Sequence, residues 1–140
     1  MNVNVFVTSI SAERFWEVDR PLPPQVQIAV NINMLDIGQR SDGSLEAPFV
    51  FAVNFTPSIA QISIRGRAKI SGEAGDTNKI MEDHKVQKPP PVQIVQAVSN
   101  VAMADAILIS RSLNIPPPLP PIPHPQTPPQ PTKSDARYTA

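Results

Sequence analysis

The groups most able to do chemistry lie together in one short segment, residues 82–85, which reads Glu-Asp-His-Lys. Carboxylates and imidazoles bind metal ions and also act as general acids and bases. Neighbours in one loop rarely converge on one ion without ligands from elsewhere, so we predict a solvated polar loop and no metal. The other histidine, His124, lies between two prolines, where nothing orients it as a base, and we expect it to be exposed.

Motifs for catalysis and cofactor binding are absent from the sequence. It contains no glycine-rich phosphate loop, no nucleophile elbow and no His-Glu helix motif, and its carboxylates are scattered singly. The chain has no cysteine, which removes disulfides, thiolate zinc sites and cysteine nucleophiles together. We therefore predict that the protein is not an enzyme and uses no cofactor.

The charges of the chain balance. Twelve Lys and Arg residues stand against twelve Asp and Glu residues, and no run of like charge occurs. A protein that binds a nucleic-acid backbone needs a concentrated positive field, so we expect no nucleic-acid partner. Arg65, Arg67 and Lys69 form the one basic cluster and would project from one face of a strand. They are either simply solvated or in contact with an acidic partner.

The length of 140 residues suits one domain, and residues 116–131 are mostly proline. The foldable part holds a single core and has little room for a second lobe with a cleft between the two. We expect a folded domain over residues 1–122 and a disordered Pro-rich tail over residues 123–140. The first residues lack a basic n-region, and no stretch approaches a membrane span. These features predict a soluble, cytoplasmic protein.

Four stretches alternate apolar and polar residues, which is typical of antiparallel strands with one wet face. Pro57 ends or kinks the third strand, and Gly66 marks a bulge or a close approach of backbones in the fourth. The segment 38–43 supplies turn residues between the second and third strands. The apolar positions are Val3, Val5 and Val7; Val26, Ile28, Val30, Ile32 and Met34; Phe49, Phe51, Val53 and Phe55; and Ile62, Ile64, Ala68 and Ile70.

One long helix follows the strands. Residues 92–113 place apolar side chains three and four apart, and the prolines from Pro116 onward end the helix by Ile115. The polar segment 71–91 is predicted to be a loop with at most one short helical turn near residues 79–85. The predicted fold class is therefore α+β, a four-stranded antiparallel sheet with one long helix packed on it.

The apolar crossover residues and Asp105 can each be interpreted in two ways. Large apolar side chains occupy the Pro-rich crossover after the first strand, where they either pack on the core or line a groove for another chain. Asp105 lies in an otherwise apolar part of the helix, either at its wet edge or at a helix–helix interface. The crossover residues are Phe15, Trp16, Val18 and Leu22.

The order of strands, crossover, helix and Pro-x-Leu-Pro-Pro segment resembles the SecB-like export chaperones. The most specific stretch runs from Asn100-Val101-Ala102 through residues 111–122, which is similar to the family's first helix and Pro/Leu segment. Residues 9–15 are similar to the strand that leads into the family's crossover. The resemblance covers about residues 3–122.

The resemblance implies an ATP-independent holdase that binds unfolded or preprotein polypeptides in an apolar groove and acts in protein export. It implies assembly as a dimer or a homotetramer through helices and edge strands. The implied client-binding residues are Phe15, Trp16, Val18 and Leu22. The implied interface residues are Val98, Ala102, Asp105 and Ile109.

Two departures from the family pattern keep alternatives open. A Pro-rich tail stands where the family has a second helix, and the sheet positions that should be acidic for docking on the export motor are neutral. The protein could instead guard a dedicated partner such as an antitoxin. It could also be an adaptor or structural protein whose tail, with a PxxP pattern in residues 117–123, binds SH3-like or WW domains. The neutral positions are Gln25, Gln27, Asn31 and Asn33.

Overall fold

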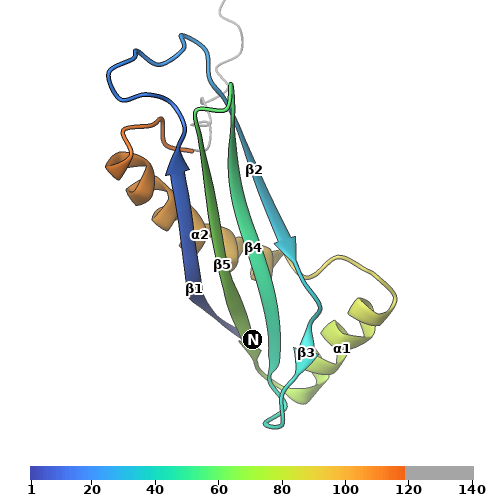
Figure 1. The fold of residues 1–140 in the computed structure, drawn as a ribbon. Coiled ribbons are helices and arrows are strands. Elements are labelled where there is room, and N and C mark those ends of the chain that lie inside the picture. Colours follow the sequence, from blue (N-terminus) through green and yellow to red (C-terminus); the bar gives the residue numbers. More distant parts are fainter. Residues whose placement is uncertain (119–140) are drawn as a thin grey trace, which may run out of the picture.

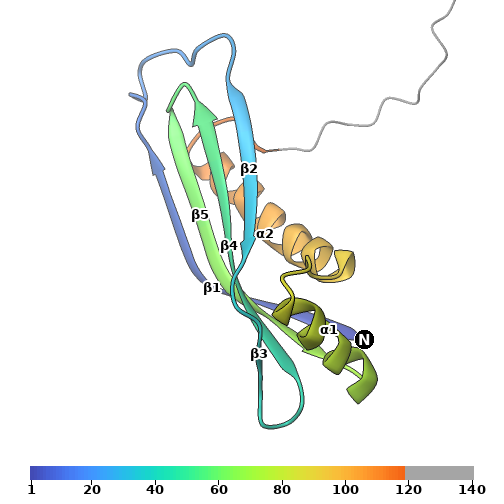
Figure 2. The ribbon, with the colours of Figure 1, turned by 90° about the vertical axis from the view of Figure 1, so that its right-hand side faces the viewer.

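An antiparallel sheet forms one layer of the fold, and a long helix crosses one of its faces (Figures 1 and 2). The computed structural model describes residues 1–118, so the predicted tail, with His124, lies outside the described residues. The strand order is β1-β5-β4-β2, and β3 pairs with β4. The elements are β1 (Asn2–Arg14), β2 (Gln27–Met34), β3 (Gly38–Gln39), β4 (Leu45–Thr56), β5 (Ala60–Ser71), α1 (Ala74–Lys85) and α2 (Val92–Ser112).

The two central strands supply most of the core. Every second residue is buried along β4, from Leu45 to Phe55, and along β5, from Ala60 to Ile70. Side chains that face each other across the two strands share one face, as Phe51 and Ile64 do. The predicted alternation is thereby confirmed, and the aromatic side chains of β4 lie in the core.

Helix α2 packs on the apolar face of the sheet with one stripe of side chains. The stripe repeats every four residues, as a helix requires for one face, and ends at Ser110, whose Oγ donates a hydrogen bond to the Ala106 carbonyl at 2.8 Å. The predicted helix and its end before the prolines are confirmed. The buried residues of the stripe are Ile94, Val98, Ala102, Ala106 and Ser110.

The opposite face of the sheet is wet. Gln27, Asn31 and Asn33 of β2 are exposed there, as the alternation predicts. On the neighbouring strands the exposed positions are also mostly polar. The sheet therefore separates an apolar side, covered by α2, from a polar side open to solvent.

The segment 71–91 corrects the sequence prediction of a loop, because residues 74–85 form the three-turn helix α1. Only Thr77 and Ile80 are buried on it, so its apolar periodicity is too weak to be seen in the sequence. His84 lies in the last turn of α1. Its Nε2 accepts a hydrogen bond from the Ile37 backbone N–H at 3.3 Å and so ties α1 to the segment after β2.

Strand β3 was also absent from the sequence prediction. It contains two residues, Gly38 and Gln39, which pair with Glu46 and Leu45 of β4. Such a short strand offers no alternation to detect. The turn that follows contains Gly43 at φ 87°, the left-handed backbone that glycine tolerates and that the Asp-Gly pair predicts.

Candidate functional site

The crossover between β1 and β2 is tied to the end of α2 by Arg14. Its Nη1 donates to the carbonyls of Leu113 and Asn114, both at 2.9 Å. Its Nε donates to the Trp16 carbonyl at 2.8 Å, and Nη2 donates to the Glu17 carbonyl at 3.2 Å. One guanidinium thus holds the start of the crossover against the C-terminal end of the helix.

The structure divides the four crossover residues into two pairs. Trp16 and Leu22 are partly buried and pack against the core. Phe15 and Val18 are 50% and 85% exposed. The Trp16 indole is fixed on two sides, because its Nε1 donates to the Pro21 carbonyl at 3.1 Å and the Arg20 guanidinium lies 4.2 Å from its ring centroid. The crossover is therefore both a strap on the core and an exposed apolar surface.

A second apolar surface lies where α2 passes the edge of the sheet at β2. This hollow of about 690 Å³, here called the β2–α2 groove, is open to solvent. None of its lining residues, all within the described part of the chain, carries a titratable side chain, so the groove suits apolar binding and not acid–base chemistry. Its lining residues are Ile32, Pro89, Pro90, Val92, Val95, Gln96, Ser99, Asn100 and Met103.

Sequence reasoning missed the β2–α2 groove. The triple proline at residues 89–91 signalled a stiff entry into the helix, but nothing in the sequence placed it beside Ile32 of β2. Val92, at the start of α2, is 77% exposed on its rim. An apolar side chain this open is consistent with a binding surface.

The side of α2 turned away from the sheet is also apolar and includes Ala97, Val101, Ala104 and Leu108, here called the outer face of α2. Val101 and Leu108 are 38% and 64% exposed. By length and composition α2 could cross a membrane, which the sequence analysis did not anticipate, and 22% of its most apolar stretch is buried in the described structure. Most of this helix therefore lacks a covering partner within the described residues.

The four predicted interface residues are not equivalent in the structure. Val98 and Ala102 are 0% exposed and face the sheet, so their side chains have no surface to offer another chain. Asp105 and Ile109 are half-buried at the flank of the helix. The sheet thus shields Val98 and Ala102 from another chain, whereas Asp105 and Ile109 keep exposed surface.

Comparison with known proteins points to one fold. No protein-family model and no curated protein sequence matches the chain. Among solved structures, it is similar to a SecB-like chaperone of Mycobacterium tuberculosis in complex with a ChAD peptide from the HigA1 antitoxin. The match covers 85% of this chain and 87% of that chain, with a TM-score of 0.57 and 9% sequence identity. The fold is SecB-like.

The SecB-like fold agrees with the predicted class, an antiparallel sheet with a long helix on one face. At 9% identity the likeness does not carry residue roles from one chain to the other. The crossover, the β2–α2 groove and the outer face of α2 must therefore be judged by their own geometry.

Replacement of Arg14 by alanine is expected to lower the free energy of unfolding by about 2 kcal/mol, since hydrogen bonds from a charged group to four carbonyls are lost. Arg14→Lys should recover less than half of this loss, because an ammonium cannot reproduce the guanidinium fork. Urea unfolding followed by tryptophan fluorescence measures both. Arg65→Lys is the control. Equal stability of Arg14→Lys and the wild type would contradict a stabilising role for the guanidinium hydrogen bonds of Arg14.

Proposed function

We propose that this protein is an ATP-independent holdase chaperone that binds unfolded or preprotein polypeptides in extended form. The single observation that carries the proposal is the exposed apolar surface beside a fixed support, with Phe15 and Val18 on a crossover held by Trp16 and Leu22. Burial of apolar area contributes about 25 cal/mol per Å² without directional requirements. Such a surface can hold many different apolar segments.

The β2–α2 groove is a second apolar surface, beside the N-terminal half of α2, whereas the crossover is held at the C-terminal end of that helix. Strand β2 pairs only with β4 among the described strands, so its outer edge also offers backbone groups to an extended segment. A client segment would place apolar side chains in the groove, near Ile32 and Met103. Client binding of this kind requires no nucleotide, metal or catalytic group, and we propose that the protein is not an enzyme.

A second candidate is a dedicated chaperone for one partner, such as an antitoxin. It is favoured by the SecB-like structural relative, which was solved with an antitoxin peptide. Both candidates use the same apolar surface, act in the cytoplasm and form a homo-oligomer, a dimer or a tetramer. They differ in the range of clients, and only the general holdase has a role in protein export.

Light scattering of an aggregating client protein, with no nucleotide added, tests the proposal. The wild-type chain should suppress aggregation at a near-stoichiometric ratio. The Phe15→Asp/Val18→Asp variant should need roughly thirty times more protein, because two apolar contacts of about 1 kcal/mol each are lost. Val92→Asp at the groove should weaken suppression to a smaller degree.

Val86→Asp is the matched control, since Val86 is 64% exposed but follows α1, outside both apolar surfaces. Suppression that survives Phe15→Asp/Val18→Asp, or that is lost equally with Val86→Asp, would contradict the proposed surface. Deletion of residues 116–140, which removes the whole PxxP pattern, distinguishes the holdase from the adaptor alternative. A holdase keeps its activity after this deletion, whereas an adaptor that works through the tail loses its partner.

A further inference from the structure

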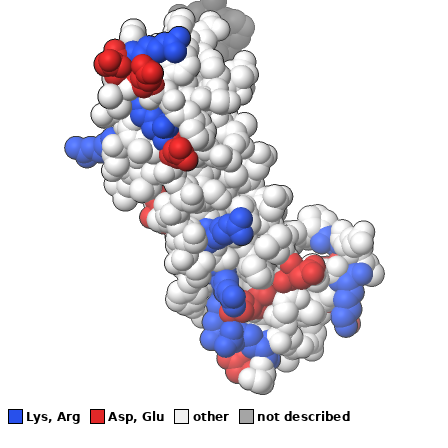
Figure 3. All heavy atoms as spheres, in the orientation of Figure 1, with Lys and Arg blue, Asp and Glu red and all other residues white. Residues whose placement is uncertain are grey.

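The wet face of the sheet, opposite α2, carries a row of basic side chains. Arg65, Arg67 and Lys69 occupy alternate positions of β5, so they project from the same face at intervals of about 6.7 Å. The Arg67 and Lys69 side chains are 56% and 39% exposed. Figure 3 shows basic side chains gathered over this part of the sheet.

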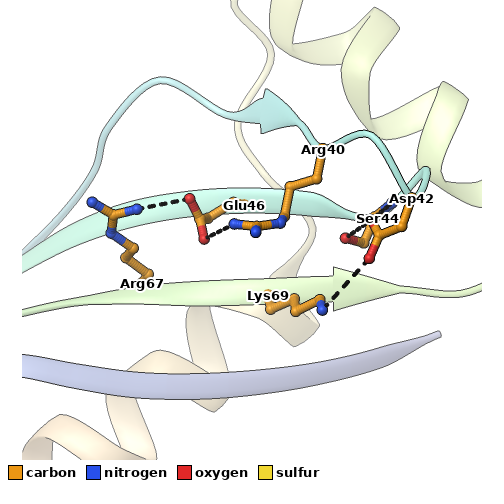
Figure 4. A network of polar contacts seen from close by, with 6 residues as sticks. All are labelled: Arg40, Asp42, Ser44, Glu46, Arg67 and Lys69. Atoms are coloured by element: carbon orange, nitrogen blue, oxygen red, sulfur yellow. Dashed lines mark hydrogen bonds and ion pairs between the residues drawn. The ribbon is translucent and has the colours of Figure 1, made fainter.

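Carboxylates beside the row form ion pairs with two of its cations, Arg67 and Lys69 (Figure 4). Glu46 of β4 is shared, with its two oxygens 2.8 Å from Arg40 Nη1 and 2.9 Å from Arg67 Nη1. Asp42 lies 3.7 Å from Lys69 Nζ. Arg65 makes no ion pair with any residue between 1 and 118. Glu13 of β1 lies on the same face and lines a hollow with Arg65, so three carboxylates stand among four cations.

Asp42 stays ionised at neutral pH. Its Oδ1 accepts hydrogen bonds from the backbone N–H of Ser44 at 2.9 Å and from the Ser44 hydroxyl at 2.5 Å. These two bonds, with a smaller contribution from Lys69, lower the pKa of the Asp42 carboxyl below its ordinary value. Asp42 therefore offsets part of the positive charge on this face, where the cations outnumber the carboxylates by one.

An aromatic side chain interrupts the basic row. Phe6 of β1 lies directly opposite Arg67 of β5 and is 55% exposed. At the end of the row, Lys69 and Phe6 line an open, mostly polar hollow together with residues of the β3–β4 turn and the start of α1. The face therefore offers several cations and one apolar contact over a short distance.

The charge of this face indicates which kind of partner can bind to it. A second copy of the chain would oppose its own basic row, and the segment 119–140 contains a single acidic side chain, Asp135. A nucleic-acid backbone is disfavoured because the chain has no net charge and this face lacks the concentrated positive field that a phosphate backbone requires. An acidic polypeptide in extended form has the same side-chain repeat as β5, so its carboxylates can meet successive cations.

We propose that this basic face binds an acidic, extended segment of a partner protein, with an apolar side chain of that segment against Phe6. The face lies on the side of the sheet away from α2 and the β2–α2 groove. A partner bound there leaves the proposed client surface free. The protein could therefore hold a client on one side and an acidic partner on the other.

Fluorescence anisotropy with a labelled peptide that carries glutamate at alternate positions and one central leucine tests the proposal. The peptide should bind at low ionic strength and weaken as salt is added. The Arg65→Gln/Arg67→Gln/Lys69→Gln variant should raise the Kd about tenfold, because three exposed charge pairs are lost. Glu46→Gln should lower the Kd about threefold, since it releases two cations from a shared carboxylate.

The matched control is Lys79→Gln/Lys85→Gln/Lys88→Gln, which makes the same change of net charge on and after α1. Arg65→Gln alone keeps the test decisive if the triple variant does not fold, because Arg65 makes no ion pair with the described residues. Unchanged binding in the β5 variants, or equal loss in the control, would overturn the proposal. Tighter binding of single-stranded oligothymidine than of the peptide would also overturn it and assign the face to nucleic acid.

Discussion

The Gly66→Ala variant is expected to lose roughly 3 kcal/mol of its free energy of unfolding, a large share of a small domain's stability. A Cβ at this position would lie 2.1 Å from the Phe6 carbonyl oxygen and 2.7 Å from Cζ of Phe49. The first contact is with backbone of the paired strand, so β1 must shift to relieve it. The second is with a buried ring that has no free space around it.

Urea unfolding of the two variants Gly66→Ala and Gly75→Ala makes the comparison, with Trp16, the only tryptophan, as the reporter. Gly75 lies in α1, and a Cβ there meets nothing within 4 Å. Gly75→Ala should therefore stabilise the protein by about 0.5–1 kcal/mol through helix propensity. Equal stability of the two variants would show that the strands β1 and β5 can separate at Gly66 without cost.

The close approach at Gly66 could be predicted from the sequence, whereas its detailed form could not. A lone glycine in a strand of alternating apolar residues indicates either a bulge or a close backbone contact. The structure contains both features on different strands. Gly66 makes the close contact in β5, and the register shift lies opposite, between Val7 and Ser9 of β1.

The long strands and their buried faces were predictable, because the alternation of apolar and polar residues indicates which face of each strand is buried. The side of α2 that contacts the sheet was predictable in part, because apolar side chains three and four apart indicate one stripe. Val98 lies on this stripe and is fully buried, whereas Val101 lies off it and is 38% exposed. The stripe also includes Ser110, a buried polar residue that apolar spacing does not reveal.

The candidate site was predictable in part for a similar reason. The aromatic crossover stood out by composition, since Phe15 and Trp16 lie beside prolines that exclude a regular strand. The attachment of the crossover to α2 depends on Arg14, whose carbonyl partners at Leu113 and Asn114 are distant in sequence. Contacts of this kind have no signal in local periodicity.

Replacement of Val101 and Leu108 by glutamate should dissociate the proposed homo-oligomer. Both side chains lie on the outer face of α2, and burial of such a side chain contributes about 1.5–3 kcal/mol. In a symmetric dimer each substitution acts twice, so the Kd for assembly should rise roughly a thousandfold or more. A carboxylate buried against an apolar partner adds to this loss.

Sedimentation velocity over a range of micromolar concentrations measures the effect. The wild-type chain should sediment as a species larger than the 15.2 kDa monomer, and Val101→Glu/Leu108→Glu should sediment as the monomer. Val86→Glu, at an exposed valine away from α2, should leave assembly unchanged. We propose that a second copy of the chain covers the outer face of α2. A wild-type chain that is monomeric at all concentrations, or that partitions into lipid vesicles through α2, would contradict this proposal.

The dissociated variant also separates assembly from client binding. Phe15 and Val18 lie on the crossover, whereas Val101 and Leu108 lie on the outer face of α2. A folded monomer that still suppresses aggregation would place the client surface within one chain. If suppression falls with dissociation while folding is intact, the binding surface needs apolar area from both copies, because one chain alone then buries too little of the client.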